Sequence, residues 1–180
     1  MIFFGHVGLT TAAVKTYENI VLKKKEGRNL PHIDYRAVMI GSILPDIIDK
    51  PIGAFFFRST FHNSRIIAHS LLFSMTLVIL GIYRINKYNK SNLFLLGISS
   101  VIHQILDSMW DFPGTFYWPV LGLKFPQRPE GDWLNESLTK LMTKPGTFIP
   151  ELIGLAIVAY YLYKAYKKGR LKDFFKHGIL

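Results

Sequence analysis

Three long apolar runs place the strongest constraint on what this chain can fold into. Residues 66–83 form a near-continuous apolar run between Arg65 and Arg84, and residues 92–110 and 147–165 form two more. A helix needs about 20 predominantly apolar residues to cross the hydrocarbon core of a bilayer. We therefore expect each run to form a transmembrane helix.

Two less apolar segments precede these runs. Residues 2–22 begin apolar and then become charged, so only part of this helix is expected to face lipid. Residues 34–49 hold an apolar stretch too short to span a bilayer, and Pro45 is expected to kink or end the helix. The prediction is an all-α, integral membrane bundle of about five helices, built as a single domain over residues 1–180.

The chain is both apolar and basic. It is 49% hydrophobic and carries 22 Lys and Arg against 12 Asp and Glu. This combination favours a membrane protein with cationic flanks over a nucleic-acid-binding protein, so we expect membrane lipids as partners and no nucleic acid. The absence of cysteine excludes disulfides and thiolate metal sites. The N-terminal residues lack the basic region of a signal peptide, and we expect them in the mature protein.

The basic residues also predict an orientation. Clusters at residues 23–28, 84–90 and 164–176 fall on one side of the membrane if five helices alternate in direction. The positive-inside rule makes that side cytoplasmic, with residues 166–180 as a basic cytoplasmic tail. Residues 111–146 then form an external loop segment, although they are basic as well. The expected location is the inner or plasma membrane, crossed several times.

Polar residues within the apolar segments indicate a site. His103, Asp107 and Asp111 follow one another at four-residue intervals, which places them along one helical face. The alternating topology brings four more residues to the same external end, namely His6, Asp46, Asp49 and His69. Polar groups inside a membrane bundle are costly unless they are paired or coordinated. Histidine and carboxylate side chains at one depth are the types that bind a divalent cation.

Each residue also has an ordinary explanation. His103 and Asp107 can form a buried hydrogen-bonded pair, and His69 can be a core histidine with satisfied hydrogen bonds. Asp46 can accept backbone N–H groups in a turn, and Asp49 can end a helix in solvent. Each of these explanations needs a separate partner, whereas one metal centre satisfies all the residues.

The order of these residues resembles that of a known family. The elements are His6, Gly41-Ser-Ile-Leu-Pro-Asp46-Ile-Ile-Asp49, Ala68-His69-Ser70-Leu71-Leu72, His103-x-x-x-Asp107, Pro113-Gly114 and Tyr117-Trp118-Pro119. They resemble the LexA-regulated, membrane-bound metal-dependent hydrolase family over roughly residues 1–125. The family often has His-Arg-Gly-x-Thr-His-Ser, whereas this chain has Ser64-Arg65-Ile66-Ile67-Ala68-His69-Ser70 and lacks the first His, the Gly and the Thr.

A more distant similarity is to the zinc-dependent phospholipase C and single-strand nuclease superfamily, whose members are all-helical phosphoesterases with a zinc cluster. Their later His-x-x-x-Glu has no counterpart here. The resemblance therefore implies one or two metal ions rather than three.

These residues predict a hydrolytic mechanism. The expected metal ligands are His6, Asp46, His69, His103 and Asp107, with zinc as the first choice and manganese or magnesium as alternatives. A bound zinc ion lowers the pKa of water from 15.7 to about 7. Asp49 or Asp111 is the candidate general base, or a partner that orients a ligating histidine. Arg65 is the candidate phosphate-binding group.

The position of the site and the family resemblance imply hydrolysis of a phosphoester in a lipid or lipid-linked substrate at the membrane surface. The residues alone do not separate a phosphoester from a carboxylic ester or an amide. Two other classes stay open. A scaffold protein with a structural metal would have a closed, fully protein-ligated site, and an ion or proton transporter would spread its polar residues along a path across the membrane.

Overall fold

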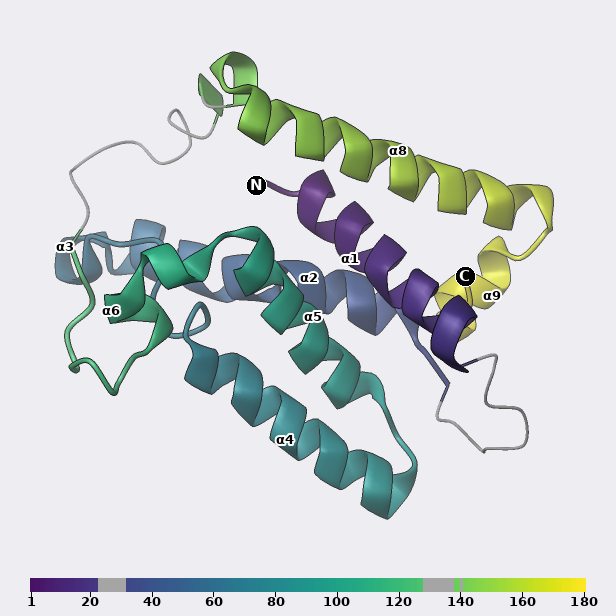
Figure 1. The fold of residues 1–180 in the computed structure, drawn as a ribbon, viewed down its shortest axis with the longest axis horizontal. Coiled ribbons are helices and arrows are strands. Elements are labelled where there is room, and N and C mark those ends of the chain that lie inside the picture. Colours follow the sequence, from purple (N-terminus) through teal and green to yellow (C-terminus); the bar gives the residue numbers. More distant parts are fainter. Residues whose placement is uncertain (23–31, 128–137, 140) are drawn as a thin grey trace.

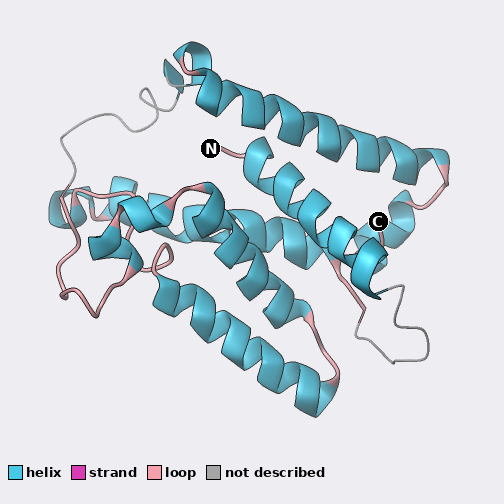
Figure 2. Ribbon diagram, viewed as in Figure 1, coloured by secondary structure: helices cyan, strands magenta, loops and turns pink. Residues whose placement is uncertain are grey.

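The computed structural model describes residues 1–22, 32–127, 138–139 and 141–180, and all of the regular structure in these residues is helical (Figures 1 and 2). The longer helices are α1 (Phe4–Tyr17), α2 (Tyr35–Asp49), α4 (Leu71–Tyr88), α5 (Asn92–Leu106) and α8 (Pro145–Lys167). The shorter elements are α3 (Arg58–Phe61), α6 (Pro113–Phe116), α9 (Leu171–His177), the π-helical turns η1 (Glu18–Leu22) and η2 (Lys50–Phe56), and the 3-10 turn η3 (Met109–Asp111). The all-α prediction is confirmed. Residues 23–28 and part of the predicted external loop lie outside the described residues.

The longer helices pack in a row. Helix α5 contacts α4 on one side and α2 on the other, and α1 contacts both α2 and α8. Figure 1 shows α4 and α8 at opposite edges of this row. The row places the two termini of the chain near α1 and α2, which lie in its middle.

Two pairs of helices approach so closely that a glycine is required between them. A Cβ atom added to Gly154 of α8 would collide with the main-chain oxygen of Phe4, and one added to Gly8 of α1 would collide with Gly154. A Cβ atom on Gly81 of α4 would collide with the backbone of Phe94 in α5. Small residues at helix contacts are typical of membrane proteins, where close backbone packing replaces the hydrophobic effect.

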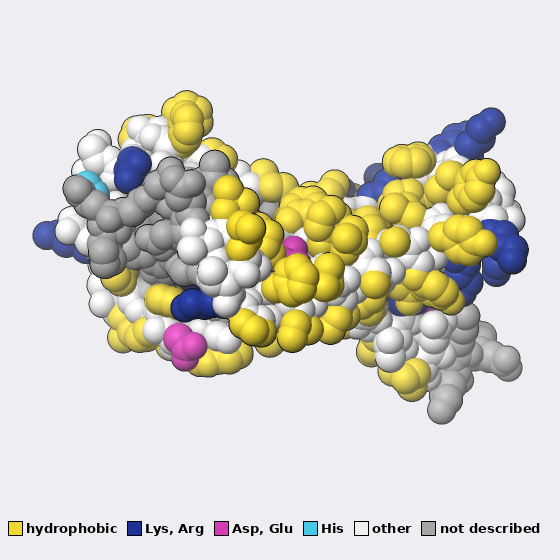
Figure 3. Space-filling model, turned by 90° about the horizontal axis from the view of Figure 1, so that it is seen from above, with side chains coloured by type: hydrophobic (Ala, Val, Ile, Leu, Met, Phe, Trp, Pro, Cys, Tyr) yellow, Lys and Arg dark blue, Asp and Glu magenta, His cyan; other side chains and the backbone are white. Residues whose placement is uncertain are grey.

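The interior is polar and much of the surface is apolar. The fully buried side chains include Thr10, Thr11, Ser99, Ser100 and Gln104. Large apolar side chains are exposed along α4 and α8, and Figure 3 shows a broad apolar surface on the face that it displays. Soluble proteins seldom expose apolar patches of this extent.

A small apolar core lies beside the first turns of α5. It joins Val14, Tyr35, Val38, Leu95 and Phe174. Phe174 belongs to α9, so the segment predicted as a basic tail contains a helix that packs into the molecule. Arg36 fixes α9 from α2, because its guanidinium donates to the main-chain oxygens of Phe175 (2.8 Å) and Lys176 (3.1 Å).

The helix boundaries differ from the predicted apolar runs. Only α8, among the described helices, is long and apolar enough to cross a membrane; α5 is apolar but shorter. Helix α4 starts at Leu71 rather than at residue 66. The residues before it form a loop whose N–H groups at positions 66, 68 and 69 donate to Asp49 at the end of α2. Helix α5 ends at Leu106, since Ser108 adopts a left-handed conformation with φ of 50°. Pro45 does not end α2, which continues to Asp49.

Candidate metal centre

The five predicted ligands come together at one end of the bundle. His6 lies in the first turn of α1, Asp46 in the last turn of α2, His69 in the loop before α4, His103 near the end of α5, and Asp107 immediately after α5. Ligand atoms of His6, Asp46 and His103 lie within 4.8 Å of one another, as do those of His69, His103 and Asp107. The two groups share His103. The five residues converge because successive helices run in opposite directions. The N-terminus of one helix therefore lies beside the C-terminus of the next on this side of the bundle.

His69 and His103 point the same ring nitrogen at each other. The Nδ1 atom of His103 lies 2.7 Å from the carbonyl oxygen of Ser42, and Nδ1 of His69 lies 2.7 Å from Asp49 Oδ2. Both acceptors lack hydrogen, so each Nδ1 carries the proton and, in the neutral ring, each Nε2 carries a lone pair. The two Nε2 atoms are 3.4 Å apart. Two lone pairs facing each other in a buried space repel unless a cation or a proton lies between them.

The spacing of these atoms fits a small divalent ion. Asp46 Oδ1 lies 3.4 Å from His69 Nε2, the same distance that separates the two histidine nitrogens. Ligand atoms bound to a tetrahedral zinc ion at about 2.0–2.1 Å lie about 3.3–3.4 Å from one another. Nitrogen and carboxylate oxygen donors are both common zinc ligands. The donor set and its spacing therefore fit a divalent metal.

His6 supports the same conclusion from α1. Its ring is fully buried and stacks on the ring of His103, with centroids 4.0 Å apart. Neither ring nitrogen makes a hydrogen bond, although Nε2 lies 3.1 Å from Asp107 Oδ1. Buried polar atoms without partners are rare in native proteins and call for an explanation such as an ion.

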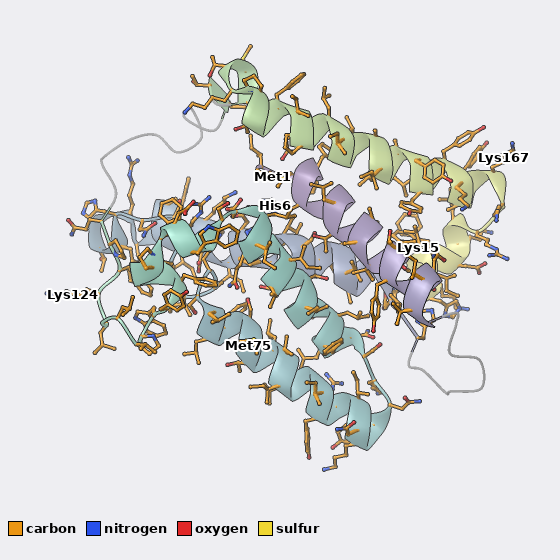
Figure 4. All side chains as sticks on the ribbon, in the orientation of Figure 1. Met1, His6, Lys15, Met75, Lys124 and Lys167 are labelled. Carbon is orange, nitrogen blue, oxygen red and sulfur yellow. The ribbon has the colours of Figure 1, made fainter. Side chains whose placement is uncertain are left out.

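Asp107 is the carboxylate of the cluster that contacts two cationic groups. Its Oδ2 accepts a hydrogen bond from Arg65 at 2.6 Å, and its Oδ1 accepts one from the amino group of Met1 at 3.0 Å. Burial raises the pKa of this carboxyl group, but the contacts with His6 and Arg65 lower it by more. The net result is a pKa well below its ordinary value. The contacts with Arg65 and the amino group of Met1 favour the ionised form of Asp107. Figure 4 labels Met1 and His6 at the start of α1, next to the end of α5.

Asp49 has a different position from the ligands. Its carboxylate is fully buried and accepts the backbone N–H groups of Ile66 (2.8 Å), Ala68 (3.0 Å) and His69 (3.0 Å), besides the ring of His69. Four hydrogen bonds occupy the acceptor sites of the carboxylate. Of the two roles that the sequence left open, these contacts fit the partner that orients a histidine.

The remaining predicted residues are placed as follows. Arg65 is partly exposed, and besides its bond to Asp107 its guanidinium lies over the ring of Phe112, 5.2 Å from the centroid. Asp111 is exposed on η3 and does not join the cluster. It was expected on the same helical face as His103, but the helix ends before it at Leu106, so the four-residue repeat no longer applies.

The sequence interpretation missed Glu151 of α8. This nearly buried carboxylate accepts the backbone N–H groups of Ile2 (2.6 Å) and Phe3 (3.2 Å), and so holds the start of α1 beside the cluster. An ionisable residue within an apolar run is a signal of function or specific pairing, and it was available in the sequence. Lys50 was missed as well; it donates to Asp46 Oδ2 at 2.7 Å.

The comparisons with known proteins agree with a membrane location. No curated protein and no solved structure matches the chain. The comparisons lend no support to the distant similarity with the phospholipase C and nuclease superfamily. A family model described as "YdjM inner membrane protein" matches residues 1–171, which include every residue of the cluster. The chain therefore belongs to the YdjM inner membrane protein family.

Proposed function

We propose that this protein is a membrane-bound, metal-dependent hydrolase that cleaves a phosphoester of a lipid or lipid-linked substrate at the membrane surface. The observation that carries the proposal is the pair of facing Nε2 atoms in His69 and His103, 3.4 Å apart, with Asp46 and Asp107 beside them. A bound divalent cation would relieve the repulsion between these lone pairs and neutralise the carboxylates beside them.

The ligands of the proposed centre are those predicted from the sequence, namely His6, Asp46, His69, His103 and Asp107. Two overlapping groups of donors support one or two ions. Zinc is the first choice because the donors are mainly imidazoles, and manganese or magnesium is the alternative. When bound, such an ion supplies an activated water and a Lewis acid for a phosphoryl oxygen.

The surrounding residues orient this donor set. Asp49 and the carbonyl of Ser42 hold the tautomers of His69 and His103, which keeps both Nε2 lone pairs directed into the cluster. Arg65 uses one of its five N–H donors on Asp107 and is partly exposed, so other donors remain for an oxygen of the substrate. This pairing of a cation and a metal centre favours an anionic substrate such as a phosphoester.

The substrate class follows from the location of the site. We infer that the bundle crosses the membrane more than once, with α8 as one span and the exposed apolar face of α4 toward lipid. Lysines and arginines at the ends of α4 and α8 away from the cluster would then face the cytoplasm, and the metal centre would face outward. A site at this boundary meets substrates that reside in the membrane, which favours lipids over soluble esters.

The test compares three purified proteins in detergent: wild type, the double variant His69→Ala, Asp107→Ala, and a control. The control, His177→Ala with Asp111→Ala, removes the same two residue types from exposed positions outside the cluster. Metal is measured by mass spectrometry, and hydrolysis of phospholipids is measured by chromatography of the products.

We expect stoichiometric metal and hydrolysis in wild type and control, and loss of both in the cluster variant. An absence of metal from all three proteins would refute the metal centre. Stoichiometric metal without hydrolysis of phospholipids or lipid-linked phosphoesters would refute the hydrolase and favour a structural metal.

A further inference from the structure

A second polar cavity lies at the end of the molecule opposite the metal centre. It has a volume of 360 Å³ and is formed where the ends of α1 and α8 meet the residues that follow α8. Its walls include Lys15, Lys164, Lys168, Arg170, Tyr160 and Tyr161. Four cationic side chains therefore line one cavity, one from α1, one from α8 and two from the turn between α8 and α9.

The cavity has an excess of positive charge. Lys15 is already engaged, because its Nζ lies 2.8 Å from Glu18 Oε2 and 2.8 Å from the main-chain oxygen of Leu180. Lys164, Lys168 and Arg170 are exposed, and no acidic side chain of the described residues forms an ion pair with them. Figure 3 shows Lys and Arg side chains gathered at this end of the molecule. Three cations that form no ion pair within the described part of the chain favour an anionic ligand.

The position of the cavity along α8 indicates where that ligand resides. Helix α8 is the described helix that is long and apolar enough to cross a membrane. Its final turns carry Tyr160, Tyr163 and Tyr166, all exposed, together with Lys164 and Lys167. Tyrosines and lysines at the end of a span mark the level of the lipid headgroups. The cavity lies beside these residues, at headgroup depth.

We propose that this cavity binds the phosphate of an anionic phospholipid headgroup. Lys164, Lys168 and Arg170 bind the phosphate oxygens, and Tyr160 positions Lys164, whose Nζ lies 5.7 Å from the centroid of its ring. The phosphate of a lipid is favoured over free phosphate because the cavity is at the membrane boundary rather than in open solvent. This site is separate from the metal centre and does not depend on the proposed hydrolase activity.

The test uses the full chain in detergent and native mass spectrometry with added lipid. Phosphatidylglycerol is compared with phosphatidylcholine of the same chain length, and inorganic phosphate is added as a competitor. The variant Lys164→Gln, Lys168→Gln, Arg170→Gln removes the three cations. The control, Arg84→Gln, Lys87→Gln, Lys90→Gln, removes an equal charge from the exposed end of α4 and the residues after it. Metal content is measured in each protein as an independent check of folding.

We expect the cavity variant to lose about tenfold or more in affinity for phosphatidylglycerol, while the control changes little and the metal content is the same in both. Equal losses of phosphatidylglycerol affinity in the two variants would overturn the proposal. They would show that the lipid is attracted to any basic surface rather than to this cavity. Displacement of the lipid by millimolar phosphate would overturn the assignment to a lipid in favour of a soluble phosphate. Equal binding of phosphatidylcholine would refute an anionic site.

Discussion

Replacement of Asp49 by asparagine tests whether this carboxylate orients the metal centre. The side chain accepts four hydrogen bonds, three of them at Oδ2 and one, from Ala68, at Oδ1. An amide in the same position keeps an oxygen for those three donors, but its NH₂ group then faces the N–H of Ala68. The variant loses the negative charge from every bond and leaves one buried N–H without an acceptor.

The magnitude follows from these contacts. An unsatisfied buried N–H group costs about 1–3 kcal/mol, and bonds to a neutral acceptor are weaker than those to a carboxylate. We expect Asp49→Asn to lower the free energy of unfolding by about 2–4 kcal/mol. The neutral amide also holds the tautomer of His69 less firmly, and loss of such a partner lowers metal affinity by about 10–100-fold.

Two measurements separate these effects. Zinc affinity is obtained by competition with a chromogenic chelator, and stability by thermal unfolding of the metal-free protein in detergent. Asp111→Asn is the matched control because it makes the same change at an exposed carboxylate. A variant that loses stability but binds zinc as tightly as wild type would refute the orienting role and leave Asp49 as an anchor of the loop alone.

Three further predictions address other parts of the structure. His6→Phe removes a buried Nδ1 that makes no hydrogen bond, but it also removes the contact of Nε2 with Asp107 Oδ1 at 3.1 Å. We therefore expect the metal-free variant to stay folded while its zinc affinity falls about tenfold or more; unchanged zinc affinity would contradict this. Gly154→Ala should lower the free energy of unfolding by about 1–3 kcal/mol through collision with Phe4, whereas Gly146→Ala, which meets open space, should raise it by up to about 1 kcal/mol; equal effects in thermal unfolding would count against the close α1–α8 contact. The hydrogen bond from Arg36 lowers the pKa of Asp34 below its ordinary 3.8, so the stability it confers is present above that pH and is lost as pH falls through the lowered pKa. Unfolding curves of wild type and Asp34→Asn should therefore converge in acid, and a gap that widens there would be inconsistent with this pair.

The convergence of the site could be predicted from the sequence because it depends on topology. Alternating helices bring His6, Asp46, His69 and His103 to one end whatever the details of packing. The start of α4 could not be predicted, because the N–H groups of residues 66, 68 and 69 bind Asp49 instead of continuing a helix. That choice depends on a side chain about 20 positions away, which periodicity does not reveal.

The exclusion of Asp111 has a local cause that a periodic pattern also misses. A four-residue repeat assumes an unbroken helix, whereas Ser108 adopts a left-handed conformation and redirects the chain. Phe174 and Glu151 were missed for a related reason. Phe174 stands in a short pair of phenylalanines within a basic segment, and Glu151 is a lone acid among apolar residues. Only their tertiary partners show what each does.

The contact between α1 and α8 brings backbone against backbone at Gly8 and Gly154. Its attraction comes from dispersion and from the fit of two main chains, rather than from removal of apolar surface from water. Hydrophobic association weakens on cooling, but dispersion does not share that dependence. The helix that carries His6 should therefore stay fixed to α8 at low temperature, even where the small apolar core around Phe174 loosens.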